Sequence, residues 1–416
     1  MERVFIGRCE EYDVTEMARV MREGMRALGI EKISGKVTIK PNVVMAHNKV
    51  ADSCFTRAEF LQALISIVGT DVIIMERSGI GMPTRRAFRR AGYSELNNVQ
   101  LYPTEENRKI NVELAKGRVL KSVEVSPPLL EHDTLIYTPK LKSNVLAQGM
   151  TGAVKLNIGL MDSTQRIWHH HRDNDIKLAD LLEIGYPDLI VTDGIVAGIG
   201  GNQMTENSLS LGVIIMARNP LAHDVVQAEI LGLNPEKIDH LRLAHERGYG
   251  PLSMGEIEVV GDANMAELKA RAAQHPNGFI RVDRLPCNLR ILTGEPYCHA
   301  GCQGIFLDWL YMIKDRNPKR FENLPHFPVV IGKYEGDVPG NRAIYIGDCT
   351  EVKGKAPFFR WRIRGCPPTH RDIILQMLIF GWIKAPLFRI DLIIDSYFWG
   401  PLYTIRRVVK KALGML

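Results

Sequence analysis

The sequence lacks any apolar run long enough to cross a bilayer, and its first residues turn polar too soon for a secretion signal. It contains no internal repeat and no low-complexity segment. It also lacks a basic stripe interleaved with aromatics, and its net charge of +6 is mild for 416 residues. A nucleic-acid partner is therefore not expected. These absences predict a cytoplasmic protein, and the length together with a hydrophobic content of 45% predicts two or three globular domains.

Cysteine is scarce, and the count of seven is odd, which argues against a fully paired disulfide framework. Thiols stay reduced in the cytoplasm, so clustered cysteines there indicate metal or redox chemistry. Glycine or proline accompanies four of them, which are Cys298, Cys302, Cys349 and Cys366. Four thiolates suit a 4Fe–4S cluster, and they equally suit a tetrahedral zinc. Tandem C-x-x-C spacings, typical of structural zinc sites, are absent, so the dispersed spacing favours an iron–sulfur cluster over zinc or over reduced core cysteines.

Up to about residue 285, short β-branched runs alternate with helix-like stretches. The expected strands lie at 37–39, 72–75, 134–137, 188–191 and 213–216, and the clearest helices lie at 14–28, 57–68 and 221–231. Such alternation predicts an α/β domain over residues 1–285 with a largely parallel sheet. Polar loops are expected where strands end, among them Asp193-Gly194, and open α/β sheets bind ligands at that edge.

The pattern changes after residue 285. Residues 286–381 contain the four clustered cysteines and two short strands, at 327–332 and 343–347, which predicts a smaller α+β domain that depends partly on its metal. Residues 382–416 end in an expected amphipathic helix with a basic face at 403–413. That helix either packs on the protein or makes peripheral contact with an anionic membrane surface.

Lysine and asparagine recur together on three predicted loops, as Lys40 with Asn42, Lys142 with Asn144, and Lys155 with Asn157. Surface exposure is the usual fate of lysine. The repetition nevertheless indicates a site for a carboxylate or a phosphate. Residues 168–173 form the unusual string Trp-His-His-His-Arg-Asp, and adjacent side chains point in different directions on any regular element. One histidine of this run, His169, is therefore a candidate for proton transfer.

These segments together resemble the bacterial and archaeal family catalogued as domain of unknown function 362. The matching pieces span roughly residues 30–250: Lys40-Pro41-Asn42, residues 76–79, residues 151–157, the histidine run, residues 190–194 and residues 220–224. The resemblance implies an α/β fold and an association with iron–sulfur clusters, and the family is similar to the N-terminal part of nickel-dependent lactate racemase. The family's appended ferredoxin module is missing here, and the distinct cysteine region stands in its place.

The combined hypothesis is an iron–sulfur oxidoreductase or electron-transfer enzyme that acts on an anionic small molecule and takes electrons from a donor protein. Lys155, His169 and Asp193 are the expected catalytic residues, and Lys40, Asn42 and Asn157 are expected to bind substrate. Lys40 and Lys155 would hold anionic oxygens, His169 would move a proton, and Asp193 would orient a base or bind a hydroxyl. Two alternatives remain: a redox-neutral isomerase or racemase with a structural metal, and a non-enzymatic assembly or membrane-surface partner.

Overall fold

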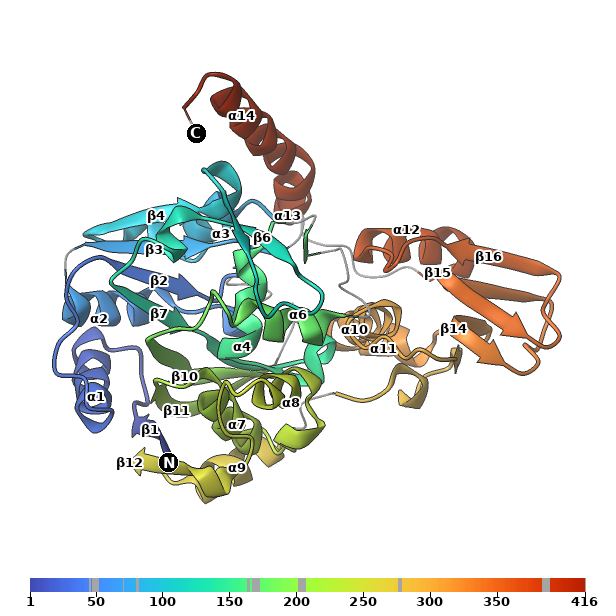
Figure 1. The fold of residues 1–416 in the computed structure, drawn as a ribbon. Coiled ribbons are helices and arrows are strands. Elements are labelled where there is room, and N and C mark those ends of the chain that lie inside the picture. The colour runs from blue at the N-terminus through green and yellow to red at the C-terminus, as the bar shows by residue number, and fades with distance from the viewer. Residues whose placement is uncertain are drawn as a thin grey trace.

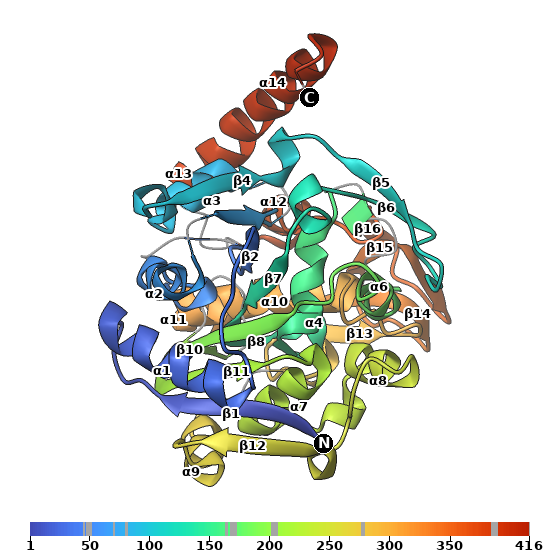
Figure 2. The same ribbon diagram turned by 60° about the vertical axis from the view of Figure 1, so that its left-hand side comes forward.

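The computed structural model has two lobes, each built around a sheet of mainly parallel strands (Figures 1 and 2). It describes residues 1–44, 46, 52–69, 71–79, 82–162, 165–166, 173–200, 207–275, 279–383 and 390–415. Within those residues, no helix has the combination of length and apolar character needed to cross a membrane.

The larger lobe contains a ten-stranded sheet whose main path runs β12-β1-β11-β10-β7-β2-β3-β4, with β8 paired to both β10 and β9. Along these pairings, β9 and β11 run against the other strands. The strands are β1 (Glu2–Arg8), β2 (Val37–Pro41), β3 (Val72–Glu76), β4 (Val99–Pro103), β7 (Thr134–Thr138), β8 (Lys140–Asn144), β9 (Gly149–Thr151), β10 (Leu189–Ile199), β11 (Asn207–Ala217) and β12 (Ile257–Gly261). A small hairpin of β5 (Ile110–Glu113) and β6 (Ser122–Val125) lies outside this sheet.

Helices cover both faces of this sheet, so the central strands are buried on both sides. On one face, α1 (Val14–Ala27) and α2 (Ala58–Val68) close one hydrophobic core. On the other face, α4 (Ala153–Leu156), α6 (Asn174–Leu181), α7 (Pro220–Ile230), α8 (Asp239–Glu246) and α9 (Met265–Ala273) close a second core. Strands buried on both faces need continuous apolar runs, which is why the β-branched segments predict them correctly. The expected α/β fold with a largely parallel sheet is confirmed.

Several predicted loops are wrong, since Lys142 and Asn144 lie in β8 and Lys155 lies in α4. Asp193-Gly194 was expected to follow a strand, because aspartate and glycine favour turns. Both residues lie inside β10, where the pairing with β11 shifts register between Gly194 and Val196. Asp193 is accommodated in the strand because Lys140 Nζ lies 2.9 Å from its carboxylate, and both side chains are fully buried.

The smaller lobe contains the four clustered cysteines and Cys287. Its sheet has the order β13-β14-β15-β16, and its strands run parallel throughout: β13 (Arg290–Thr293), β14 (Pro328–Glu335), β15 (Arg342–Lys353) and β16 (Phe359–Ile363). The helices α10 (Cys302–Arg316), α11 (Pro318–Glu322) and α12 (His370–Gly381) pack with it. The rings of Phe306 and Trp309 stack in this core with centroids 5.4 Å apart.

The chain returns from α12 to the larger lobe. There α13 (Ile390–Ile394) and the π-helical turn η10 (Asp395–Trp399) lead into α14 (Gly400–Ala412). Figure 1 shows α14 projecting from the molecule beyond α3 (Thr84–Arg90). The predicted C-terminal helix at 403–413 is therefore present, and it begins a few residues earlier than expected.

Candidate functional site

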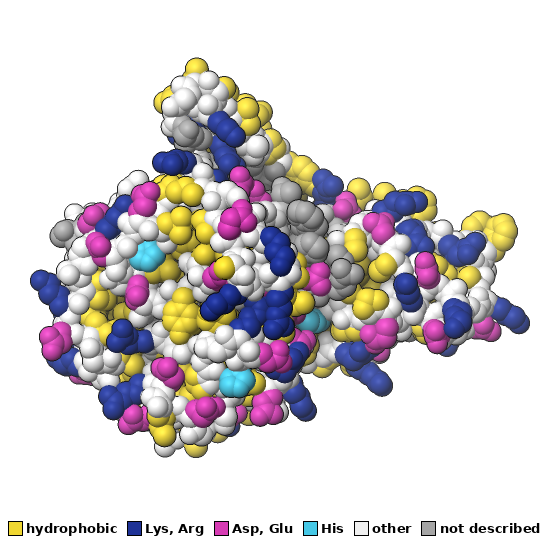
Figure 3. All heavy atoms as spheres, viewed as in Figure 1, with side chains coloured by type: hydrophobic (Ala, Val, Ile, Leu, Met, Phe, Trp, Pro, Cys, Tyr) yellow, Lys and Arg dark blue, Asp and Glu magenta, His cyan; other side chains and the backbone are white. Residues whose placement is uncertain are grey.

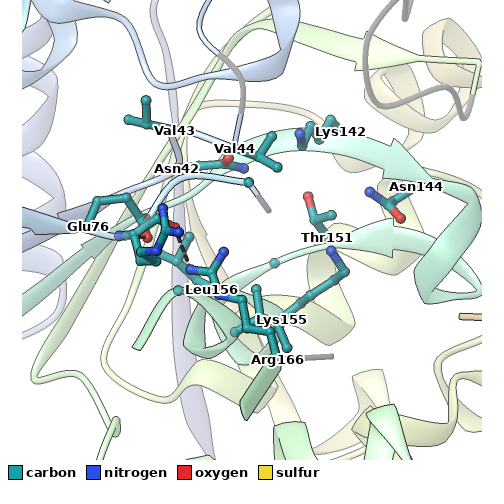
Figure 4. A pocket seen from close by; sticks show the side chains of 15 residues that line it. Asn42, Val43, Val44, Glu76, Lys142, Asn144, Thr151, Lys155, Leu156 and Arg166 are labelled. Atoms are coloured by element: carbon teal, nitrogen blue, oxygen red, sulfur yellow. Dashed lines mark hydrogen bonds between the residues drawn. The ribbon is translucent and has the colours of Figure 1, made fainter. Parts of the chain in front are cut away.

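A pocket lies where β2, β3 and β8 end, at the edge of the sheet that the sequence indicates. It encloses about 450 Å³, part of it open to solvent. Figure 4 shows Asn42 and Glu76 on one side of it and Lys142, Asn144 and Thr151 on the other. The remaining lining residues are Val43, Val44, Arg77, Gly79, Gly152, Lys155, Leu156, Ile158, Gly159 and Arg166. Four of the lining side chains are cationic and one is acidic, which favours an anionic ligand.

A buried ion pair lies beneath this pocket. Lys40 Nζ is 2.8 Å from Glu76 Oε2, and the two side chains are 0% and 4% exposed. Burial lowers the pKa of Lys40, and the carboxylate of Glu76 opposes that shift. A Cβ atom added at Gly159 would lie 2.1 Å from Glu76 Oε1 and 2.4 Å from Lys40 Nζ. Glycine at position 159 is therefore what lets the short helix of residues 157–160 approach the ion pair.

Arg166 lines the pocket and holds the loop after β3 in place through hydrogen bonds. Its guanidinium donates to the carbonyls of Met161, at 3.1 Å, and Ser78, at 2.5 Å, and also to that of Arg77. Burial lowers the pKa of Arg166 to about 9, with the nearby guanidinium of Arg77 adding to the effect. This side chain is committed to backbone carbonyls, so we assign it to holding the pocket rather than to binding a ligand.

Asn144 Nδ2 and Thr151 Oγ1 are buried polar atoms in the pocket wall that have no hydrogen-bond partner among the residues that the structure describes. Buried polar groups are nearly always paired, so each unpaired atom calls for an explanation. A bound ligand would supply the missing acceptor for Asn144. Neighbouring Lys142 is 1% exposed and donates to the carbonyl of Cys54 at 3.1 Å.

Lys155 reaches the pocket from α4, whose first turn is held by Asp224. The backbone amides of Ala153 and Val154 donate to the two carboxylate oxygens of Asp224, at 2.7 and 3.0 Å. A Cβ atom at Gly152 would lie 2.2 Å from that carboxylate, so the close approach requires glycine. His223 Nδ1 lies 2.7 Å from Asp224 Oδ1 and helps to hold that carboxylate in place. The Pro-Leu-Ala-His-Asp segment at 220–224 thus positions Lys155.

The predicted site residues fall into separate places. Asn42 and Lys155 line the pocket, and Lys40 lies beneath it. Asn157 is buried and accepts a hydrogen bond from the Tyr137 hydroxyl at 2.5 Å. Asp193 lies in a second buried network with Lys140 and with the hydroxyl of Tyr12, which donates to it at 2.8 Å. His169 lies outside the described residues.

The four clustered cysteines are brought together at the C-terminal ends of strands in the smaller sheet. Cys298 and Cys302 follow β13, Cys349 lies at an irregularity in β15, and Cys366 follows β16. The first two are buried and the last two are exposed. Burial raises the pKa of the Cys302 thiol, and the proximity of Cys349, Cys298 and Cys366 raises it further. Among the described residues, no three of these sulfur atoms lie within 4.8 Å of one another.

Backbone contacts hold the cysteine loops against each other. The amide of Asp348 donates to the carbonyl of Gly365 at 3.1 Å, and the amide of Gly365 donates to the Asp348 side chain at 3.2 Å. Arg362 donates to the carbonyls of Gly347 and Thr350, each at 2.8 Å. A Cβ atom at Gly347 would lie 2.7 Å from Cys302 Sγ. Glycine at this position therefore leaves the space in front of the Cys302 sulfur open.

The pocket and the cysteine cluster are neighbours. Asn144, in the pocket wall, accepts the amide of Leu146 at 2.8 Å and so begins the short helix η5 (Val145–Ala147). Val145 and Leu146 pack into the same hydrophobic core as Cys302. The helix α10, which begins at Cys302, thus rests on the turn that directly follows the pocket.

A polar bridge also links the two lobes beside Cys298. His299 Nε2 lies 2.9 Å from Asp175 Oδ2, and His240 Nδ1 lies 3.2 Å from the other oxygen. Burial by itself would raise the pKa of Asp175, but the two histidines lower it below its ordinary value. Asp175, Asp239 and His299 each bring one ligand atom within 4.8 Å of the others, a nitrogen and oxygen set able to hold a divalent cation. Apart from the position of His299 next to Cys298, no sequence pattern predicts this bridge.

The fold and the pocket define an α/β protein with a polar pocket at the carboxyl edge of a largely parallel sheet. Residues 37–229 match the family model described as Domain of unknown function (DUF362). The expected resemblance is confirmed for these residues. The matched range contains the predicted lysine, asparagine, histidine and aspartate residues and ends before the cysteine domain.

Two further proteins are similar to this chain. The thylakoid-associated protein sll1697 of Synechocystis sp. is 24% identical over 271 residues, which cover 60% of this chain and 81% of that protein. The lactate racemase apoprotein from Thermoanaerobacterium thermosaccharolyticum aligns with 81% of this chain and 70% of its own, at 12% identity and a TM-score of 0.36.

Proposed function

We propose that this protein is an iron–sulfur oxidoreductase or electron-transfer protein whose larger lobe binds an anionic small molecule. The observation that carries the proposal is the convergence of four thiols from three separate loops around Cys302. Cys302 also begins α10, where the helix dipole stabilises a thiolate. Thiols gathered this closely repel one another once ionised, and a bound metal centre removes that repulsion.

The donor set fits a 4Fe–4S cluster held by Cys298, Cys302, Cys349 and Cys366. A tetrahedral zinc holds thiolates at about 2.3 Å, which puts neighbouring sulfur atoms about 3.8 Å apart. A cubane cluster has a body of eight atoms, so its thiolates stand further from one another. The dispersed spacing of the four cysteines along the chain, without a C-x-x-C pair, supports the cluster over zinc. Such a cluster would supply one-electron transfer.

The pocket supports a carboxylate or phosphate as the ligand. Lys155 and Lys142 would contact the anionic oxygens, and Asn144 would donate the hydrogen bond that its Nδ2 lacks within the described chain. The buried pair of Lys40 and Glu76 fixes the floor and keeps its own charges balanced. His169 stays the proposed proton carrier.

An acidic electron-donor protein is the proposed partner. Cys349 and Cys366 are exposed, and the neighbouring Arg360 and Arg364 are exposed beside them. Surface cations near a cluster attract an acidic carrier and speed its docking. We propose the cytoplasm as the compartment, because it keeps these thiols reduced.

The experiment is metal analysis of the full chain purified without oxygen. The proposal expects about four iron and four sulfide per chain, as one 4Fe–4S cluster requires. One zinc per chain without sulfide would overturn it and favour a redox-neutral enzyme with a structural metal. Calorimetric titration with small carboxylates and inorganic phosphate tests the pocket independently of the metal.

A further inference from the structure

The C-terminal segment is anchored at its base and projects beyond it. Asp395, in η10, is fully buried, and its carboxylate lies 2.9 Å from Arg86 Nε and 2.7 Å from an Arg90 nitrogen, both on α3. The Arg86 guanidinium also lies 5.4 Å from the centre of the Trp399 ring. These contacts fix where α14 leaves the larger lobe (Figures 1 and 2).

None of the residues of α14, Gly400–Ala412, is buried, although one side of the helix lies against the turn η3 (Thr104–Glu106) of the larger lobe. Leu402, Ile405, Val408 and Val409 are 43%, 60%, 62% and 49% exposed. Their spacing of three and four residues places them on one stripe of the helix. An apolar stripe of this kind is normally buried against a core, so this one calls for a partner.

A second exposed apolar patch lies on the cysteine domain. Leu375, Leu378 and Ile379 on α12 are 43–52% exposed, and Trp382 directly after it is 73% exposed. Figure 3 shows hydrophobic side chains along the outer side of the projecting helix and along the upper edge of the smaller lobe. The two patches therefore face the same side of the molecule.

The charges beside the stripe have one sign. Arg406, Arg407, Lys410 and Lys411 fill the remaining side of α14, and residues 396–416 contain no aspartate or glutamate. Beside the second patch, Arg371 on α12 is paired with Asp372 at 3.3 Å, so the positive charge is concentrated on α14. A helix with an apolar stripe and a basic face matches the boundary between acyl chains and anionic head groups.

We propose that α14, together with the exposed face of α12, binds the surface of an anionic lipid bilayer. The apolar stripe enters the boundary of the acyl region, and the arginine and lysine side chains extend to the lipid phosphates. The buried ion pairs of Asp395 hold the helix at a fixed angle to the larger lobe, so both lobes lie on the same side of the lipid surface.

Vesicle flotation of the full chain tests this proposal. We expect binding to phosphatidylcholine vesicles that contain about 30% phosphatidylglycerol, weak binding to pure phosphatidylcholine, and release by salt. The double variant I405S/V409S should lose about tenfold or more in affinity, because it removes two side chains of the stripe. The variant R407S/K411S should lose the preference for anionic lipid.

The control is L130S, which changes a single exposed leucine on the larger lobe, away from α14. Leu130 is 42% exposed, and the variant should leave flotation unchanged. Because α14 buries no residue, the variants should keep the wild-type melting temperature, which circular dichroism checks. The proposal is overturned if the wild-type chain does not float with anionic vesicles, or if I405S/V409S floats equally well. A wild-type dimer that I405S/V409S converts to monomer, without flotation, would assign the stripe to a second copy of the chain instead.

Discussion

The two sheets place their chemistry at the same edge but stabilise it in different ways. In the larger sheet, buried ion pairs that are complete within the protein, Lys40 with Glu76 and Lys140 with Asp193, hold the polar site. In the smaller sheet, four thiols converge, and two of them are exposed. The first site is therefore preorganised by the fold, whereas the second depends on what its thiols bind. Each of the following predictions tests one side of this difference.

The largest expected effect concerns the thiols. Replacing Cys302, as C302S, removes the ligand at the centre of the cluster, so we expect loss of nearly all iron and sulfide and a less stable smaller lobe. Iron and sulfide assays with proteolysis of the two lobes measure this. The control is C287S, because Cys287 is half-buried elsewhere in the domain and contacts the carbonyl of Leu289. Full iron content in C302S would show that the thiols do not act as one site.

The second effect concerns the pocket floor. The variant K40M leaves the Glu76 carboxylate buried without its partner, and we expect it to lower the free energy of unfolding by about 3–5 kcal/mol. Urea unfolding followed by circular dichroism measures the loss. The double variant K40M/E76Q should recover part of it, since it also removes the unpaired charge. Iron content should change in neither folded variant, and a parallel loss of iron would contradict the separation of the two sites.

The third effect concerns the ligand. The variant K155M removes an ammonium group that lines the pocket, and we expect about tenfold weaker binding of small carboxylates or phosphate. Isothermal titration calorimetry measures the affinity, with K237M as the control because Lys237 is exposed on the larger lobe. Equal affinity in K155M and wild type would remove Lys155 from the proposed site.

The last prediction concerns how the stability of the larger lobe depends on pH, through Lys177 beside the pocket. Lys177 donates to the carbonyl of Arg166 at 2.8 Å, and burial lowers its pKa from 10.5 to about 8. Between these two values the unfolded chain binds more protons than the folded chain, so stability rises with pH, by at most about 1.4 kcal/mol per pH unit for one group. Urea unfolding from pH 7.5 to 10 should show a shallower rise for K177M than for wild type. An unchanged slope would contradict this assignment.

Much of the fold follows from the sequence, because strands buried on both faces require the β-branched runs seen at 37–39, 72–75 and 134–137. The site was harder to predict, since its geometry depends on pairings between distant residues. Lys40 looks like a loop lysine, but Glu76, 36 positions later, pairs with it inside the fold. Asp193 looks like a turn residue until Lys140 neutralises it within β10.

Other features of the two sites also could not be predicted from the sequence alone. The repeated lysine and asparagine pairs indicated the right edge of the sheet but not its elements, since they lie in strands and short helices. Only the folded chain separates Asn144, which lines the pocket, from Asn157, which bonds to Tyr137. The contact between Asp175 and His299 joins two lobes and leaves no local pattern in the sequence.

The central claim is that Cys298, Cys302, Cys349 and Cys366 hold one redox-active cluster. Electron paramagnetic resonance of the anaerobically purified chain, before and after reduction by dithionite, tests it most directly. The account predicts one paramagnetic reduced cluster per chain, bleaching of the broad visible absorbance on reduction, and loss of both signals in C302S. A chain that holds one zinc ion and shows neither signal would contradict it.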